Sequence, residues 1–498
     1  MSIPDERLGR WNDAPIRPER DWVVYWMTAQ RRTHWNFALQ HAVARAQELQ
    51  RPLLILEALR AGYPWASDRL HRFILDGMEG NARRLAGIPL TYYAYVEPEP
   101  DAGSGLLEAL AENAALVVAD DAPIFFLRRM VDAAAKRLDV RLEGVDSNGL
   151  LPLAVATRPF LRAVDFRRFI QRALPEHLVC MPAEDPLEGV ELPAPVALPE
   201  KLSKRWPNLA DALAEGNPPD PADLPIDHGV VPASIPGGQE AATKRLYDFL
   251  EHGLPRYQEG RLDIENPSPS GLSPYLHFGH ISPHQIFAAL TEVEDWSPDQ
   301  LNDEKIRGQR EGYWGMSANA EAFLDQLATW RELGYNTAHH QGRASESYDS
   351  LPEWAIKSLA EHAGDSREHL YELETLESAT TYDELWNAAQ RQLVRDGTIH
   401  NYLRMLWGKK ILEWSPSPQA ALDVMWHLNN KYALDGRNPN STSGIFWCLG
   451  RYDRAWGPER PIFGKIRYMS SDSARRKLRL GSYLERYGSR KTMVPERH

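Results

Sequence analysis

The chain has 498 residues, of which 43% are hydrophobic, so it holds about three domains with a full-sized core and is neither a disordered chain nor a small scaffold. Its 57 basic against 69 acidic residues leave a net charge of −12, which excludes a polybasic nucleic-acid binder but not a local basic patch. The chain has two cysteines, which suits a reducing cytoplasm. It has no apolar run as long as a membrane span, and its start, MSIPDERLGR, is charged where a signal peptide would be apolar, so we expect a cytoplasmic protein that crosses no membrane.

The first part of the chain alternates apolar runs with amphipathic stretches, beginning with WVVYWM at Trp22. Strands are predicted at 22–27, 52–59, 89–96, 115–119 and near 140, and helices at 35–50, 69–85 and 128–138. This alternation is typical of an α/β domain with a doubly wound parallel sheet. Neither G-x-G-x-x-G after the first strand nor a P-loop motif occurs, so an ordinary dinucleotide or P-loop site lacks support.

The middle of the chain, between about Pro175 and Pro236, is rich in proline, acidic residues and alanine, which excludes a regular element of any length. We therefore expect an α/β domain over 1–175, a connector over 176–236 and a second domain over 237–498. Helical patterns with apolar residues at three- and four-residue intervals occur at 240–250, 283–291, 319–333, 382–394, 399–413 and 418–430. They predict that the C-terminal domain is all-α.

The segment PSPSGLSPYLHFGHIS, residues 267–282, places Ser270 and Ser273 around Gly271, just before a helix predicted to begin near Ser273 and Pro274. Hydroxyl groups and unpaired amides at a helix start favour a phosphate or pyrophosphate. An ordinary capped loop is the structural alternative.

The helix predicted in IHNYLRMLWGKKILEW carries Trp407 and Trp414, seven residues apart and hence on one face. Trp386 lies on the preceding helix, and the chain has 16 tryptophans in all. Such a series indicates either core packing or an aromatic surface for a flat ligand. Arg404 and Asp435 are candidates for a charge pair near a polar ligand, or for a surface salt bridge.

The last 48 residues, from Arg451, hold 13 lysines and arginines against 5 acidic residues, interleaved with aromatic side chains. This composition suits a nucleic-acid face, because basic residues pair with phosphates and rings stack on bases. A solvated C-terminal helix is the alternative. His339, His340 and His400 lack the spacing of metal ligands, and no metal site is predicted.

Six segments in this order resemble the photolyase/cryptochrome superfamily, and specifically its class II cyclobutane pyrimidine dimer photolyases: WVVYWM, SGLSPYLHFG, LWNAAQ, RMLWGKKILEW, LDGRNPN and FGKIRYM. The resemblance extends from about Trp22 to about Tyr468 and is weakest over 180–235. It implies an α/β domain that holds an antenna chromophore in some relatives, with its identity here unknown. It also implies an all-α domain that binds FAD, reduced in the active form.

The resemblance assigns cofactor residues position by position. The family's positions around the FAD phosphates are matched by Tyr257, Ser270, Gly271, Leu272 and Ser273. On the flavin side, Asn429 matches the family's asparagine that is aimed at the reactive nitrogen. Arg404 and Asp435 match its arginine–aspartate pair, and Gly436 and Arg437 follow that aspartate. The class II tryptophan chain that carries an electron from the surface to the flavin is matched by Trp407, Trp386 and Trp414.

The lesion side is matched in part. The resemblance implies that Trp330 and Trp447 hold a flipped dimer and that Asn401 and Met405 flank it, where relatives that repair (6-4) photoproducts have histidines. We also expect Arg467 to contact a lesion-strand phosphate. Two places depart from the family: Gln326 stands where class II members have glutamate, beside Asp325 as a shifted alternative, and NTAHHQGRASESY differs from an aromatic-rich pattern.

The implied function is light-driven repair of UV-damaged DNA, in which reduced FAD donates an electron to a pyrimidine dimer and takes it back after the ring splits. The cofactor performs the difficult chemistry, and we expect the protein to be a monomer. Two alternatives remain open: a cryptochrome-like photoreceptor, or a photolyase acting on another lesion.

Overall fold

A computed structural model describes residues 3–123 and 125–489. Contacts divide the chain into two compact units, each described here by itself. The first unit comprises the chain up to Phe160 together with Val164–Glu251 and Ser270–Arg343. The second unit comprises Leu161–Ala163, His252–Pro269 and the chain from Ala344 onward. The domain boundaries expected from composition, at 175 and 236, stay a prediction.

The first unit contains a six-stranded sheet, which confirms the predicted α/β class. Its strands are β1 (Leu8–Arg10), β2 (Trp22–Met27), β3 (Leu53–Leu59), β4 (Thr91–Val96), β5 (Ala114–Asp120) and β6 (Leu142–Val145), in the order β1-β6-β5-β2-β3-β4. The five strands β2 to β6 pair in parallel, as predicted. The edge strand β1, which was not predicted, is antiparallel to β6 and only three residues long.

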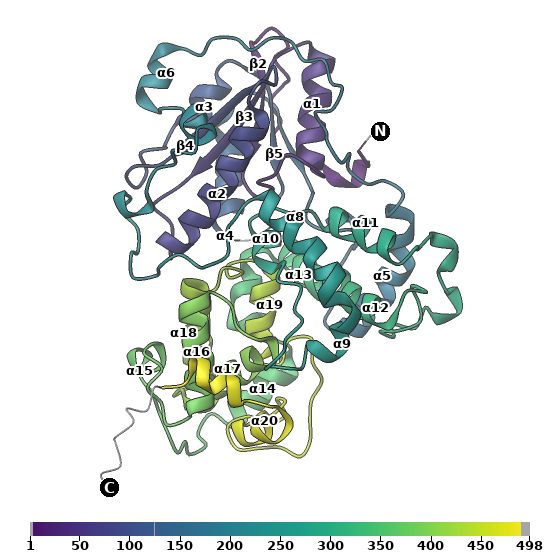
Figure 1. Cartoon of the computed structure of the whole chain (residues 1–498), viewed down its shortest axis with the longest axis vertical. Helices are drawn as coiled ribbons and strands as arrows, with labels where there is room; N and C mark the ends of the chain where they lie inside the picture. Colours follow the sequence, from purple (N-terminus) through teal and green to yellow (C-terminus); the bar gives the residue numbers. More distant parts are fainter. Residues whose placement is uncertain (1–2, 124, 490–498) are drawn as a thin grey trace. The chain divides into compact units, whose positions relative to one another are not determined.

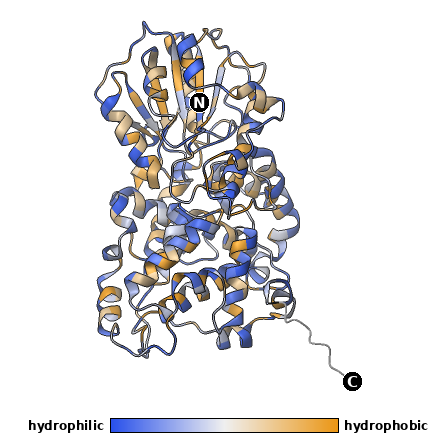
Figure 2. Cartoon of the chain, turned by 90° about the vertical axis from the view of Figure 1, so that its left-hand side faces the viewer, coloured by the Kyte–Doolittle hydropathy of each residue, from blue (hydrophilic) through white to orange (hydrophobic). Residues whose placement is uncertain are grey.

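The sheet is apolar on both faces because helices cover both. All six residues of β2 are buried, and the strands are coloured as hydrophobic in Figure 2. Trp22, Val24 and Trp26 share one core cluster with residues of α3 (Leu106–Ala111) and α4 (Phe125–Arg137). Side chains alternate along a strand, so the residues between them face the opposite side, where α1 (Phe37–Leu49) and α2 (Asp68–Leu85) pack, as Figure 1 shows.

The remainder of the first unit is helical. Its further helices are α5 (Ala163–His177), α6 (Glu200–Arg205), α7 (Ala210–Ala214), α8 (Gln239–Asp248), α10 (Ser273–His277), α11 (Pro283–Val293), α12 (Ala318–Leu324) and α13 (Glu332–Gln341). Between 178 and 236 the two α-helices have only six and five residues, which agrees with the predicted absence of long elements there.

The second unit is all-helical, which confirms the expected all-α character of the C-terminal region. Its helices are α9 (Tyr257–Gly260), α14 (Glu353–Glu361), α15 (Leu373–Glu377), α16 (Glu384–Asp396), α17 (Asn401–Trp414), α18 (Pro418–Tyr432), α19 (Pro439–Trp447), α20 (Ser471–Lys477) and α21 (Gly481–Tyr487). Among residues 3–123 and 125–489, no helix has both the length and the apolar character needed to cross a membrane.

One helix prediction was wrong in part. The pattern at 319–333 predicts a single helix, but the structure has α12, then a π-helical turn, η8 (Asp325–Arg331), and then α13. A π turn inserts a residue without breaking the apolar pattern, so periodicity does not reveal it. Such turns are frequent at functional sites.

Candidate functional site

The three tryptophans of the expected electron chain lie in contact within the second unit, and we call them the tryptophan row. The rings of Trp407 and Trp386 are stacked, with centroids 6.5 Å apart and planes at 2°. The rings of Trp386 and Trp414 meet edge to face at 5.5 Å. All three side chains are at most 3% exposed. Trp386 therefore joins the two tryptophans of α17, which sequence spacing alone had placed together on one face.

Hydrogen bonds fix the ring positions in the tryptophan row. Asp383 caps α16 by accepting from the backbone N–H of Trp386, and the Trp386 indole donates to the carbonyl of Trp407 at 3.0 Å. The Trp407 indole donates to Gln390 Oε1 at 2.8 Å. Gln390, one helical turn after Trp386, was not identified from the sequence. Gln390 stands four residues after Trp386, and this spacing could have indicated that the two side chains share one face of the helix.

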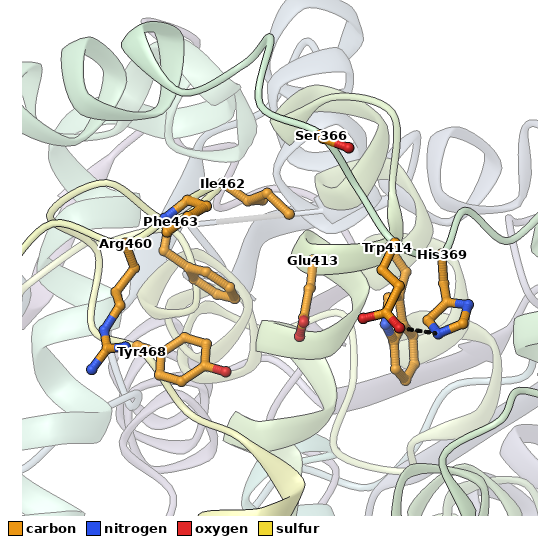
Figure 3. Close-up of a pocket in the computed structure, with 10 residues that line it drawn as sticks. Ser366, His369, Glu413, Trp414, Arg460, Ile462, Phe463 and Tyr468 are labelled. Atoms are coloured by element: carbon orange, nitrogen blue, oxygen red, sulfur yellow. Dashed lines mark ion pairs between the residues drawn. The ribbon is translucent and has the colours of Figure 1, made fainter.

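A pocket of about 260 Å³ opens beside Trp414, the last member of the row. Phe463, Tyr468 and His369 line it together with carboxylate groups (Figure 3). The row thus runs from a buried indole, Trp407, to one that borders a pocket.

A polar cluster stands on helices α17 and α18 and the turn that follows them. Arg404 and Asp435 form the predicted charge pair, with Nη2 and Oδ1 3.1 Å apart and both side chains largely buried. Asn429 is buried, and its carboxamide donates to Ser441 Oγ at 2.8 Å. Arg404 and Trp407 are three residues apart on α17, so the charge pair and the tryptophan row share one helix.

The turn after α18 is shaped by Gly436 and Arg437. A Cβ on Gly436 would lie 3.0 Å from the carbonyl oxygen of Asn429, so the chain passes too close for a larger residue. The buried Arg437 guanidinium donates to the carbonyls of Asn430, Ala433 and Leu434 at the end of α18. The direct partners of Arg437 are thus backbone carbonyls, and its part in cofactor binding stays a prediction.

The loop with the predicted phosphate site lies in the first unit. Helix α10 begins at Ser273, as expected, and Gly271 has φ +68°, a conformation that favours glycine. The Arg245 guanidinium lies against this glycine and donates from Nε to the carbonyl of Ser270 at 2.7 Å. Arg245, which sequence reasoning missed, brings a cation to the loop, and the Leu272 amide faces Ser270 Oγ at 3.4 Å.

The loop in the first unit and the polar cluster in the second unit are each compared, by itself, with one part of a flavin dinucleotide. The glycine loop has donors of the kind that a pyrophosphate requires, and the Arg245 guanidinium beside it is also paired with Asp248 at 2.6 Å. Arg404, Asp435 and Asn429 supply a cation, an acceptor and an amide donor of the kind that orients a polar ring system. Tyr257, at the start of α9 in the second unit, is buried, and Arg261 lies 5.9 Å from its ring. The cofactor roles of these residues stay predictions.

The π turn η8 holds the departure from the family pattern. Asp325 is buried and paired with Arg167 of α5 through two contacts of 2.6 and 3.1 Å. Its neighbours Gln326 and Trp330 are partly exposed. Because both carboxylate oxygens of Asp325 are occupied by one guanidinium, Asp325 is a structural ion pair, which weighs against it as the lesion-side acid. Gln326, by contrast, is partly exposed.

Of the residues expected on the lesion side that belong to the second unit, Trp447 ends α19 and is partly exposed, Asn401 begins α17 and is exposed, and Met405 lies one turn later. Arg467 lies over Trp447 and Trp456, with its guanidinium carbon 5.3 and 4.1 Å from the two centroids, and pairs with Asp453 at 2.9 Å. The side chain of Arg467 is 39% exposed, so part of it is accessible to a phosphate.

The basic C-terminal stretch forms short helices rather than one. Helices α20 and α21 carry basic residues in their last turns, and Tyr483 of α21 is buried against Tyr487. Arg490, Lys491 and Arg497, which belong to the predicted basic segment, lie outside the described residues.

Comparison with known proteins identifies the family. The DNA photolyase profile matches residues 23–194. A deoxyribodipyrimidine photo-lyase of Methanothermobacter thermautotrophicus is 34% identical over 97% of this chain and 98% of its own length. One of Arabidopsis thaliana is 33% identical over 96% and 90%. A class III photolyase from Agrobacterium tumefaciens has the same fold, with a TM-score of 0.65 and 18% identity over 94% of this chain and 86% of its own.

The profile match covers the five parallel strands from Val23 of β2 onward, and the full-length relatives also cover the helices that carry the tryptophan row and the polar cluster. The chain belongs to the DNA photolyase family, within the photolyase/cryptochrome superfamily.

Proposed function

We propose that this protein is a class II photolyase, which uses light and bound FAD to split cyclobutane pyrimidine dimers in DNA. The observation that carries the proposal is the continuity along α17. Arg404 of the polar cluster and Trp407 of the tryptophan row are one turn apart, and the row continues through Trp386 to Trp414 beside a pocket. A cation–carboxylate pair joined to contacting indoles is an arrangement for holding and reducing a redox cofactor.

In this proposal the chain's own residues divide the work. When bound and reduced, the flavin supplies the light-excited electron that opens the dimer. Arg245 and the backbone of Ser270–Ser273 bind the phosphates, and Arg404 with Asp435 orients the ring. Asn429 faces the ring in this proposal, and its amide nitrogen, which donates to Ser441 Oγ at 2.8 Å and to Asn430 Oδ1 at 3.3 Å, releases one of these partners to donate to the flavin. The tryptophan row conducts electrons inward to restore the reduced state.

The lesion class rests on the residues that match the family's lesion side. Asn401 and Met405 stand where histidines would indicate a (6-4) photoproduct, and the full-length relatives are named deoxyribodipyrimidine photo-lyases. Extruding a dimer requires little energy because its bases are already poorly paired and stacked. Trp330 and Trp447 provide aromatic surfaces for the extruded lesion. We further propose that the α/β unit holds an antenna chromophore and that the protein works as a monomer on UV-damaged DNA inside the cell.

The test is illumination of the chemically reduced protein with an oligonucleotide that carries one dimer. We expect restored pyrimidines in the light and none in the dark, and a flavin released on heat denaturation. Asp435→Asn should retain less flavin, because it removes the partner of Arg404. A colourless protein that also takes up no added FAD would rule out the proposal. Photoreduction without repair would identify a cryptochrome-like receptor instead.

A further inference from the structure

Two consecutive lysines of α17 are both buried, each with its ammonium near an indole, but their polar partners differ. Lys410 pairs with Glu413 at 2.8 Å. Lys409 is 0% exposed, and its ammonium donates to the carbonyl of Cys448 at 2.7 Å. In the part of the chain that the structure describes, no carboxylate comes within ion-pair distance of Lys409. A buried charge without a carboxylate partner is costly, so such a group is a candidate for function.

Close helix packing directs Lys409 to the lesion-side tryptophan. A Cβ on Gly408 would lie 2.4 Å from Cys448 Sγ, so α17 approaches the end of α19 as closely as glycine allows. Lys409 is the next residue of α17, and its Nζ lies 5.0 Å from the centroid of the Trp447 ring. The Arg467 guanidinium lies 5.3 Å from the same centroid. Trp447 therefore has two cationic neighbours.

The charges around Trp447 do not cancel. Asp453 pairs with Arg467 at 2.9 Å and also accepts from the Trp456 indole, which leaves the Lys409 charge as the local excess. A desolvated ammonium near an indole is held by the ring quadrupole and draws electron density towards itself. The ring then presents a less negative surface to the carbonyl oxygens of a bound pyrimidine dimer.

We propose that the buried ammonium of Lys409 is a positioning residue whose charge holds and polarises Trp447 as a platform for the lesion. The inference rests on the proposed function, in which Trp447 contacts the flipped dimer. A purely structural lysine would serve only as the donor to Cys448, and any neutral donor of similar length would replace it. The charge of Lys409 is what separates the two roles.

Titration provides the experimental handle on that charge. Burial lowers the pKa of Lys409 to about 8, with Cys448 and Asp453 opposing the shift and Arg467 adding to it. Burial raises the pKa of the Cys448 thiol to about 11. Burial also tends to raise the pKa of the Asp453 carboxyl, but its hydrogen bonds to Arg467 and Trp456 keep that pKa below its ordinary value. Arginine keeps its charge throughout. Between about pH 7 and pH 9, Lys409 therefore changes its charge, whereas the groups that face it keep theirs.

The experiment measures, in the dark, the dissociation constant of a dimer-containing duplex between about pH 6.5 and 9.5. Wild-type protein should bind about tenfold more weakly at the alkaline end, where Trp447 loses the cation that polarises its ring. Lys409→Gln keeps a donor for Cys448 but has no charge, so its binding should be weak and level across the range. Lys431→Gln, at a lysine paired with Glu377, should keep the wild-type profile.

The outcomes are distinct. Identical pH profiles for wild type and Lys409→Gln, or tight binding by Lys409→Gln at neutral pH, would overturn the inference. Trp447→Ala should remove the pH dependence, and a profile that survives this change would also contradict it. Illumination of the same samples reports the proposed function separately. Repair with a level wild-type profile refutes the inference alone, whereas absence of both repair and dimer binding refutes the two together.

Discussion

The tryptophan row and the Trp447 site lie in the same helical unit and share α17, yet they surround their indoles differently. In the row, rings contact rings and are shielded from solvent, and one of them, Trp414, also has the Lys410 ammonium 5.3 Å from its centroid. At Trp447 the ring is partly exposed and its charged neighbours are Lys409 and Arg467. Indoles in mutual contact suit electron transfer, and an accessible indole beside cations suits a nucleobase and its phosphates. The surroundings, rather than the residue type, separate the two roles.

The largest expected effect comes from breaking the row at its middle. Trp386→Phe should abolish light-driven reduction of bound flavin, because Trp386 contacts both Trp407 and Trp414, and Trp407→Phe should act alike. Dark binding of a dimer-containing duplex should be unchanged. Transient absorption after a flash measures the first effect and titration of the duplex the second.

The reciprocal variant makes this test decisive. Trp447→Phe should weaken duplex binding and leave photoreduction intact. Trp426→Phe, at a tryptophan of α18 that contacts Phe446 rather than the row, serves as the control for a general packing defect. Undiminished photoreduction in Trp386→Phe would show that electrons reach the flavin by another route, and the two sites would then not differ as described.

A smaller effect is expected at the charged boundary of the Trp447 site. Arg467→Ala should weaken binding to damaged and undamaged duplex alike and reduce the slope of log K against log salt by about one unit, as for one lost phosphate contact. Asp453→Asn should instead strengthen duplex binding at low salt, because it removes the carboxylate that pairs with Arg467. An unchanged salt slope with loss of dimer binding alone would assign Arg467 to the lesion itself.

Sequence reasoning was most successful where periodicity controls the structure. The five parallel strands and α16, α17 and α18 follow from patterns that local side chains dictate. It failed at β1, which is three residues long and depends on β6 for its hydrogen bonds, and at the π turn η8. Neither β1 nor η8 produces a periodic pattern of apolar residues in the sequence, because tertiary contacts determine both.

The candidate site shows the same limit. The Arg404–Asp435 pair was predicted from residue types and is present. The partners of its neighbours Trp407 and Asn429, which are Gln390 and Ser441, were missed, and so was Arg245 at the glycine loop of the first unit. They are ordinary polar residues whose role depends on which helix packs against which. Likewise, nothing in GKK distinguishes Lys409 from Lys410, because both are buried and only their partners differ, Glu413 for Lys410 and the carbonyl of Cys448 for Lys409.

The smallest effect is expected at Gln326, which extends the comparison to the first unit. Trp330 belongs to neither kind of site: among the described residues no ring or cation contact is found for it. Its lesion-side character therefore depends on its neighbours in η8, of which Gln326 is accessible and Asp325 is paired with Arg167. A glutamine donates and accepts hydrogen bonds but cannot transfer a proton, whereas a protonated glutamate there can donate to the negative charge that develops on the dimer.

Gln326→Glu should therefore raise the quantum yield of repair modestly, since preorganised neutral donors already supply most of the stabilisation. Asp325→Asn is the matched control at the adjacent position. It should mainly destabilise the fold, by about 3–5 kcal/mol, because it leaves the Arg167 guanidinium buried without its carboxylate. Quantum yield per absorbed photon and thermal unfolding separate the two effects. If Asp325→Asn retains its stability but abolishes repair, while Gln326→Glu lowers the yield, then Asp325 is the lesion-side acid. The ion pair with Arg167 would in that case have to open when DNA binds.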